Sequence, residues 1–185
     1  MESNFLVHPI PPLYDKDSRI LILGSFPSPK SREAQFFYGH PQNRFWKVMA
    51  QVLDWRGEGG EFQAAGGPAA NGPVIVPSAV AEKRAMLLSN HIALWDTIAS
   101  CEITGASDAS ITNVTPNDLS PILKAAKIRA IFCNGAASHK LYMKYIYPVT
   151  GREAVKLPST SPANAAWSVE RLVTEWQTVL TYLKT

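Results

Sequence analysis

The side chains best suited to chemistry gather in two short stretches of this sequence. Residues 24–31, Gly-Ser-Phe-Pro-Ser-Pro-Lys-Ser, follow an apolar run, and such a Gly/Pro/Ser-rich turn exposes backbone N–H groups and hydroxyls. In residues 38–47, polar His40, Gln42 and Asn43 stand directly against the apolar Phe45-Trp46. These groups could hold an anion or the edge of a nucleobase by hydrogen bonds.

Each of these features also has an ordinary structural interpretation. An Asn just before a helix commonly caps it, His40 can be a hydrogen-bonded structural histidine, and a Gly/Pro-rich turn can simply end a strand. A third polar stretch, residues 158–164 (Pro-Ser-Thr-Ser-Pro-Ala-Asn), favours the functional interpretation of these loops over the structural one. It follows the last predicted strand, so we expect it at the same sheet edge as the other two.

The elements that must position these residues alternate along the chain. Short apolar runs predict buried strands at residues 19–24, 91–95, 128–133 and 154–157. Helical spacing of apolar residues predicts helices at residues 44–53, 79–89, 117–126, 136–147 and 165–183. Parallel strands need crossover helices, so the pattern predicts an α/β fold, a three-layer α/β/α sandwich around a mostly parallel four-stranded sheet.

In such a sheet, ligands bind beyond the carboxyl ends of the strands. We therefore expect the site among residues 24–31, 96–101, 134–135 and 159–164. The chain length fits one domain over residues 1–185. Residues 55–77 are rich in Gly and Pro, which predicts a surface loop, with a lid over the site as the less favoured interpretation.

Composition limits the classes of partner and location. The net charge is +3, which permits a polyanionic partner without requiring one. Cys101 and Cys133 stand far apart, and neither has a second Cys or a His at zinc-finger spacing, so we expect no metal and no disulfide. Without a secretory signal pattern or a long apolar run, the sequence predicts a soluble, cytoplasmic protein with no membrane partner.

Taken together, the motifs resemble a known family. Tyr38-Gly39-His40-Pro41-Gln42-Asn43-Arg44-Phe45-Trp46-Lys47, with Gly24-Ser25-Phe26-Pro27 before it and residues 159–164 near the end, looks like the hypoxanthine-DNA glycosylases. That group is family 6 of the uracil-DNA glycosylase superfamily. Residues 92–98 and 131–135 resemble its middle strands, so the likeness covers most of the chain outside the Gly-rich insertion.

The sequence departs from many relatives at two positions that matter for mechanism. Phe26 stands where many have an Asp or Asn that positions or activates the attacking water, and Ser159 stands where several have His or Asn. The family resemblance implies that Asn43 is the catalytic residue instead. Its carboxamide could accept a hydrogen bond from water while donating to another group.

The resemblance also implies how the base is held. Tyr38 aligns with the aromatic residue that stacks under the base in related mismatch-specific uracil glycosylases, although it could be a core aromatic, and Phe26 is expected beside the base. Asp96, Asn117 and Asn134 are candidates for hydrogen bonds to the base edge. Asn117 could instead cap a helix and Asp96 could end a strand, so Asn134 is the favoured residue.

The DNA backbone is expected to lie against the Ser-rich loops. The predicted DNA contacts are Ser28, Ser31, Ser159, Ser161 and Asn164, with Asn164 or Ala165 near the vacated stack and support from Lys30, Arg44 and Lys47.

The resulting prediction is a monomeric, cofactor-free glycosylase that needs no obligate protein partner and acts on DNA containing a deaminated base. It is expected to be monofunctional, because no Lys stands out as a Schiff-base nucleophile. Two alternatives stay open at this point. One is a mismatch-specific uracil or thymine glycosylase, and the other is a non-catalytic DNA-binding member of the fold.

Overall fold

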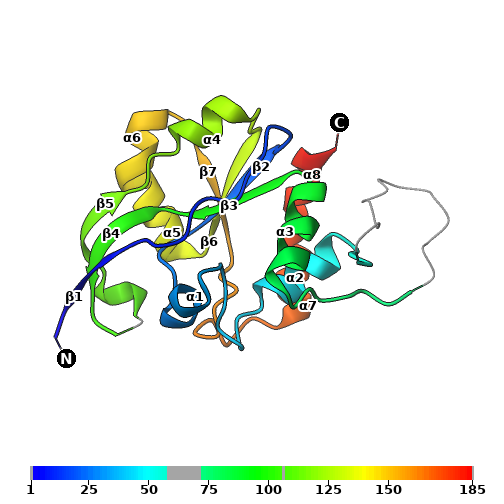
Figure 1. The fold of residues 1–185 in the computed structure, drawn as a ribbon, viewed down its shortest axis with the longest axis horizontal. Helices are drawn as coiled ribbons and strands as arrows, with labels where there is room; N and C mark the ends of the chain where they lie inside the picture. Colours follow the sequence, from blue (N-terminus) through cyan, green and yellow to red (C-terminus); the bar gives the residue numbers. More distant parts are fainter. Residues whose placement is uncertain (1, 58–71, 106, 185) are drawn as a thin grey trace.

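The computed structural model describes residues 2–57, 72–105 and 107–184 (Figure 1). Its centre is a four-stranded sheet in the order β3-β2-β6-β7, with all neighbouring strands parallel. The strands are β2 (Ile20–Gly24), β3 (Ile92–Asp96), β6 (Ala130–Asn134) and β7 (Ala154–Leu157). The predicted α/β fold with a four-stranded sheet is therefore confirmed.

Strand β2 shows why this sheet is covered on both faces. All five of its residues are buried. Because side chains alternate along a strand, Ile20 and Ile22 pack into one apolar cluster while Leu21 and Leu23 pack into another. A continuous apolar run is what a strand between two helical layers requires.

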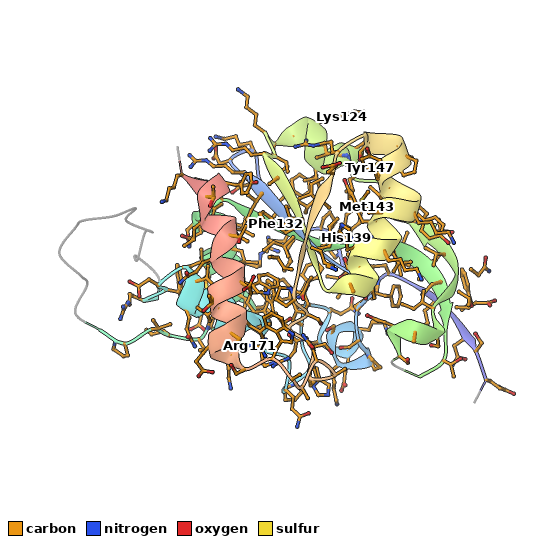
Figure 2. The ribbon with its side chains drawn as sticks, turned by 180° about the vertical axis from the view of Figure 1, so that it is seen from behind. Lys124, Phe132, His139, Met143, Tyr147 and Arg171 are labelled. Carbon is orange, nitrogen blue, oxygen red and sulfur yellow. The ribbon has the colours of Figure 1, made fainter. Side chains whose placement is uncertain are left out.

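Helices form a layer on each face. One face carries α2 (Phe45–Val52), α3 (Val80–Ser89), α7 (Val169–Trp176), the 3₁₀ turn η3 (Gln177–Val179) and α8 (Leu180–Leu183). The other carries α4 (Ser120–Ala125), α5 (Ala136–Leu141), the π-helical turn η2 (Tyr142–Ile146) and α6 (Tyr147–Thr150). Figure 2 shows these layers from behind, with Arg171 on one side of the sheet and His139, Met143 and Tyr147 on the other.

A second sheet was not predicted. Strands β1 (Asn4–Val7), β4 (Ile98–Ile103) and β5 (Thr112–Pro116) form an antiparallel sheet in the order β1-β4-β5. Of residues 96–101, where part of the site was expected, Ile98 onward belong to β4, which begins two residues after the last residue of β3. Strands β1 and β5 are largely exposed, so they lack the continuous apolar runs that identified the central sheet.

Short helical elements lie in or beside the predicted loops. Helix α1 (Pro29–Ala34) occupies the expected Ser-rich turn and is capped by Ser28, whose hydroxyl accepts from Ser31 N at 3.2 Å. Helix α4 begins at Ser120 and not at residue 117. The 3₁₀ turn η1 (Asp108–Ser110) connects β4 to β5.

The Gly-rich insertion begins later than the sequence suggested. Trp55 is buried in the core, and Ile75 N donates to Trp55 O at 2.9 Å, so the first and last parts of the expected surface loop are attached to the fold. Residues 58–71 lie outside the described part of the chain. Within the described residues, no helix is both long and apolar enough to cross a membrane.

Strand order fixes where the site must lie. After β2 the chain returns to β3 on one side of it, and β6 later pairs with its other side. Loops leaving such neighbours diverge and open a crevice at their carboxyl ends. The crevice therefore lies beyond Gly24 and Asn134, where α1 and the loop after β7 meet at the bottom of Figure 1.

Candidate active site

A cavity of about 520 Å³ opens at this crevice. Its walls come from the loops after β2, β6 and β7, the segment before α2, and η1. It brings together most of the predicted site residues: Phe26, Ser28, Ser31, Tyr38, Asn43, Asp96, Asn134, Ser159 and Ser161. Asn164 lines an adjoining groove, and Asn117 lines neither hollow.

The side-chain carbonyl oxygen of Asn43 already accepts two hydrogen bonds from the protein. Asn43 Oδ1 accepts from Phe45 N at 2.9 Å and from Thr160 Oγ1 at 2.9 Å. An amide oxygen has two lone pairs, so the part left free is the amide nitrogen, which makes no hydrogen bond to any described residue. The sequence-based expectation that this carboxamide accepts from water is therefore corrected: it faces the cavity as a donor.

Thr160 makes hydrogen bonds to both Asn43 and Asn134, and this role was not predicted. Its hydroxyl donates to Asn43 Oδ1 and accepts from Asn134 Nδ2 at 2.9 Å, and its N–H donates to Asn134 Oδ1 at 3.0 Å. The side chain is completely buried. The sequence drew attention to the neighbouring serines, whereas the only signal for Thr160 was its place in the same loop.

The side-chain nitrogen and oxygen of Asn134 are therefore both hydrogen-bonded to Thr160. The residue after it, Gly135, has φ +96°, and a Cβ there would lie 3.0 Å from Ser159 Cβ. Only glycine suits this combination of left-handed backbone and close approach. The contact holds the loop after β6 against the loop after β7.

Arg44 donates its hydrogen bonds within the protein, which argues against the predicted role in attracting phosphate. Its guanidinium donates to the carbonyls of Ser161 at 2.7 Å, Asn164 at 3.0 Å and Thr160 at 3.3 Å, and also to that of Trp167. These four hydrogen bonds use most of the five N–H groups of the guanidinium, which leaves little capacity for a phosphate. Its role is to shape residues 160–167 into a rigid loop.

The other predicted cations lie outside the cavity. Lys30 pairs with Glu33 at 3.1 Å on the exposed side of α1. Lys47 is exposed on α2.

Tyr38 is held in an unusual backbone conformation beside the cavity. Its φ is +52°, a value that costs a non-glycine residue about 1–3 kcal/mol and persists only where surrounding structure holds it. The ring stacks on Phe45 with centroids 4.1 Å apart and planes at 21°. Phe45 therefore supports the predicted stacking platform from within the core.

The Tyr38 hydroxyl is buried and makes no hydrogen bond to a described residue. Burial raises the pKa of this phenol far above its ordinary value, and the negative charge of Asp96 raises it further, while the nearby Asn134 side chain opposes the shift. The hydroxyl is thus a permanent O–H donor without a partner.

Asp96 is held by a residue the sequence did not single out. His8 Nε2 lies 2.7 Å from Asp96 Oδ2, and both side chains are almost fully buried, with 3% and 6% exposed. His8 comes from the segment after β1 and gave no sequence signal, because it stands alone and far from any motif.

Asn117 turns away from the cavity. Its amide donates to the carbonyls of Asp96 at 2.9 Å and Ile98 at 3.1 Å, which fastens the junction between β3 and β4. Neither predicted role, contact with the base edge or a helix cap, fits this geometry. Asp118, not Asn117, accepts from the first turn of α4, through Ser120 N at 2.9 Å.

Phe26 lines the cavity as an apolar wall. It is buried, its ring meets the His8 ring edge-on at 5.8 Å, and the Arg32 guanidinium lies 5.7 Å over its face. The position that carries Asp or Asn in many relatives therefore offers no hydrogen-bonding group here.

Asp108, which was also not predicted, adds a second carboxyl group to the cavity wall. Asp108 is an exposed residue, yet its carboxyl turns into the cavity and accepts from Ser25 Oγ at 2.8 Å. Burial of that carboxyl raises the pKa of Asp108 above its ordinary value, with Asp96 adding to the rise and the Ser25 hydrogen bond opposing it.

Each of the predicted DNA contacts already makes a hydrogen bond within the protein. Ser31 is buried and its hydroxyl accepts from Gly39 N at 2.9 Å, which gives it an internal role in place of a backbone contact. Ser28 caps α1. Ser159, Ser161 and Asn164 lie on the loop that Arg44 braces, where Asn164 Nδ2 donates to Ser159 O at 3.0 Å.

The described residues contain no group of three or more His, Cys, Asp or Glu side chains placed to hold a metal ion. The cavity is lined by amides, hydroxyls, two carboxyl groups, the His40 imidazole and the Arg32 guanidinium, together with aromatic rings.

Comparison with known proteins agrees with this geometry. The family model described as "Uracil DNA glycosylase superfamily" matches residues 11–183. A protein of Methanosarcina acetivorans named "Hypoxanthine DNA glycosylase" is 30% identical, over 91% of this chain and 94% of that protein. One of the same name from Methanosarcina barkeri is 30% identical, over 83% of this chain and 85% of that protein.

A solved structure supports the same relationship. The solution NMR structure of a structural genomics target from Methanosarcina acetivorans is 28% identical, with a TM-score of 0.73 over 97% of this chain and 100% of that chain. The resemblance read from the motifs is thus confirmed over nearly the whole length. This chain belongs to the uracil DNA glycosylase superfamily.

Proposed function

We propose that this chain is a monofunctional DNA glycosylase that hydrolyses the N-glycosidic bond of a deaminated nucleotide in base excision repair. Hypoxanthine is the preferred base, with uracil and xanthine as further substrates. The observation that carries the proposal is the free amide nitrogen of Asn43 in the cavity at the sheet edge. The two Methanosarcina relatives named as hypoxanthine DNA glycosylases support the choice of base.

The cavity has the size and character that a flipped base needs. Its volume of about 520 Å³ falls within the range of small-molecule sites, about 300–1,000 Å³. Tyr38 provides a ring face, and stacking of a base on an aromatic ring contributes about 1–3 kcal/mol. This energy offsets the loss of stacking and pairing when the nucleotide leaves the duplex.

Asn43 is the proposed catalytic residue. As the bond between the sugar and the base breaks, positive charge develops on the sugar and negative charge develops on the base. The Asn43 amide donates to the oxygen of the attacking water and holds it against the sugar carbon. The hydroxyl of that water ends on the sugar and its proton goes to the base, so no metal or cofactor is required.

The loop of residues 159–164 is the proposed DNA clamp. Ser159, Ser161 and Asn164 present hydroxyl and amide groups on a segment that Arg44 holds rigid. A preformed loop loses little conformational freedom when it binds the backbone. We further propose that the enzyme acts as a monomer in the cytoplasm, as the sequence predicts.

The test is base release from labelled duplexes that contain hypoxanthine, uracil, xanthine or only normal bases, followed by alkaline cleavage at abasic sites. The proposal predicts release of hypoxanthine by the wild type and release slower on the order of 100- to 1,000-fold by Asn43→Ala. Gln42→Ala is the matched control, because this neighbouring side chain is exposed and lies outside the cavity. Release of uracil alone would favour a mismatch-type uracil glycosylase, and binding without release would favour a non-catalytic member.

A further inference from the structure

We propose that Arg32, supported by the ring of Phe26, binds a backbone phosphate of the nucleotide whose base enters the cavity. The ligand is a phosphodiester, and neither residue was predicted in this role. The inference rests on the proposed function and deepens it, because it assigns the contact that holds the DNA backbone at the cavity.

Arg32 supplies positive charge to a cavity that also holds two carboxyl groups. Among the described residues that line it, Arg32 is the only Lys or Arg, whereas Asp96 and Asp108 are both present. Carboxylates oppose the approach of a phosphate, and a cation beside them lowers that electrostatic cost. The cations that the sequence favoured do not line the cavity: Lys30, Arg44 and Lys47.

The guanidinium of Arg32 has no hydrogen-bond partner or ion pair within the described residues. The hydrogen bonds that Arg32 makes to them use its backbone, where Arg32 N donates to Ser28 O at 2.9 Å and Arg32 O accepts from Gln35 Nε2 at 2.6 Å. Five N–H donors thus remain for a ligand. Their planar fork matches two oxygens of a phosphate, which makes Arg a common phosphate ligand.

Phe26 gives this guanidinium a fixed surface. Arg32 Cζ lies 5.7 Å from the centroid of the Phe26 ring, within the range of a cation–π contact. The ring itself is 8% exposed and packs in a buried cluster with Ile98, Cys101 and Ile103. Stacking uses only the face of the guanidinium, so its N–H edges stay free for a phosphate.

The same contact gives a function to the family departure at position 26. Many relatives carry an Asp or Asn there, and the Phe26 ring cannot replace its hydrogen bonds. It instead supports a cation at the cavity wall.

Helix α1 fixes Arg32 relative to the proposed stacking ring. Gly39 N donates to Ser31 Oγ at 2.9 Å, and a Cβ on Gly39 would lie 3.1 Å from Lys30 O. The helix therefore packs closely against the segment that carries Tyr38. A base stacked on Tyr38 and a phosphate held by Arg32 are thus bound by one rigid unit.

The position of Arg32 limits which phosphate it can reach. A flipped nucleotide rotates about its backbone, so its base enters the pocket while its own phosphates stay at the mouth. A side chain on the cavity wall contacts one of the two phosphates that flank this nucleotide. Such a contact adds affinity without reading sequence.

Arg32→Gln tests the contact through the salt dependence of DNA affinity. The probe is a duplex containing the tetrahydrofuran analogue of an abasic nucleotide, which has no glycosidic bond to cleave. Binding is expected to weaken about tenfold or more, and the slope of log affinity against log salt to become shallower by about 1. An unchanged slope would overturn the inference.

Two variants serve as controls for charge. Arg84 is exposed on α3 and lines neither hollow, so Arg84→Gln removes one positive charge and is expected to keep the slope. Arg32→Lys keeps the charge and loses the planar fork, so it is expected to keep the slope and lose about threefold in affinity. A slope as shallow in Arg32→Lys as in Arg32→Gln would contradict a phosphate contact.

Neutral phosphates locate the contact on the DNA. Each phosphate near the abasic analogue is replaced in turn by an uncharged methylphosphonate. The wild type is expected to lose affinity at one of the two flanking positions, where Arg32→Gln loses nothing further. If no flanking replacement weakens the wild type, the inference is wrong, and this result does not depend on how any variant folds.

Phe26→Leu tests the supporting ring while keeping an apolar side chain. It is expected to lower affinity about threefold when Arg32 is present and to have no effect in Arg32→Gln, because the two side chains act as a pair. An equal loss in both backgrounds would show that Phe26 acts independently of Arg32.

Single-turnover release of hypoxanthine separates a phosphate contact from a contact with the departing base. For Arg32→Gln, the enzyme concentration that gives half-maximal release is expected to rise about tenfold, in step with the loss of affinity. A fall in the maximal rate with an unchanged salt slope would assign Arg32 to the base and overturn the inference.

Failure of the inference is distinct from failure of the proposed function. If the wild type releases no deaminated base, the proposed function falls and the inference with it. If the wild type releases hypoxanthine while Arg32→Gln keeps the wild-type salt slope, only the inference is wrong.

Discussion

Thr160 Oγ1 donates to Asn43 Oδ1 at 2.9 Å, a contact between residues 117 positions apart in the sequence. The same hydroxyl accepts from Asn134 Nδ2 at 2.9 Å, so one buried oxygen joins the loops after β6 and β7 to the start of α2. This arrangement orients the Asn43 amide. Its oxygen accepts two hydrogen bonds from the protein, and its nitrogen stays available for the role proposed for it.

Replacing Thr160 by Val removes that hydroxyl at nearly constant volume. Asn43 Oδ1 then loses one donor and Asn134 Nδ2 its acceptor, and unsatisfied buried groups cost about 1–3 kcal/mol of stability. Base release is expected to fall about tenfold as Asn43 loses its fixed orientation. Urea unfolding and single-turnover release measure the two effects. Thr160→Ser retains the hydroxyl and should stay near wild type, and equal losses in both variants would speak against this role.

Arg44→Lys tests whether the guanidinium shapes the clamp loop. A lysine ammonium cannot reach the carbonyls of Ser161, Asn164 and Trp167 together, so stability is expected to drop by about 2–3 kcal/mol. Arg44→Gln removes the positive charge, and the salt dependence of DNA affinity is expected to keep its slope in this variant, because the guanidinium donates to backbone carbonyls and neutralises no phosphate. A shallower slope with unchanged stability would restore Arg44 as a phosphate contact.

Gly24→Ala crowds the Asp96 carboxyl, which lines the cavity. The added Cβ would lie 2.3 Å from Asp96 Oδ1, closer than any real contact permits, so Asp96 must move. Hypoxanthine release is expected to fall at least about 100-fold. Gly72→Ala is the control, because a Cβ there would have open space around it. Undiminished release by Gly24→Ala would show that base release does not depend on the position of the Asp96 carboxyl.

Asp108 gives the fold a definite pH dependence. Its pKa is raised above the ordinary value of 3.8, first by burial and then by Asp96, against the opposing Ser25 hydrogen bond. The folded state therefore holds the proton more tightly than the unfolded chain, and this stabilisation is lost as pH rises through the raised pKa.

Asp108→Asn removes that titration. The variant should gain stability relative to wild type as pH rises from below 3.8 to neutrality, measured by urea unfolding across that range. Because the residue is partly exposed, solvent screening keeps the difference below about 1 kcal/mol. A constant difference at all pH values would mean that the carboxyl titrates alike in the folded and unfolded chain.

The central sheet and the position of the site could be predicted from sequence because their signals are local. Apolar runs such as residues 19–24 identify strands buried on both faces, and strand order then places polar loops at one edge. The antiparallel sheet escaped prediction because β1 and β5 expose much of their length, and exposed strands carry little hydrophobic pattern.

The roles within the site were less predictable, since they depend on which partner each polar group finds. Arg44 looked like a phosphate ligand, but folding surrounds it with backbone carbonyls. Asn134 looked free at a strand end, yet Thr160 occupies it. His8 lies 88 residues from Asp96, and no short-range pattern links the two.

The most direct measurement compares single-turnover release of hypoxanthine by the wild type, Asn43→Ala and Asn43→Asp. The aspartate keeps an acceptor for Phe45 N–H and Thr160 and so preserves the loop, but it lacks the donating NH₂. If the amide works as a donor, both variants should lose on the order of 100- to 1,000-fold in rate while Asn43→Asp keeps wild-type stability. An Asn43→Asp enzyme as fast as the wild type would contradict this account, because it would show that the residue acts by accepting a proton or hydrogen bond from water.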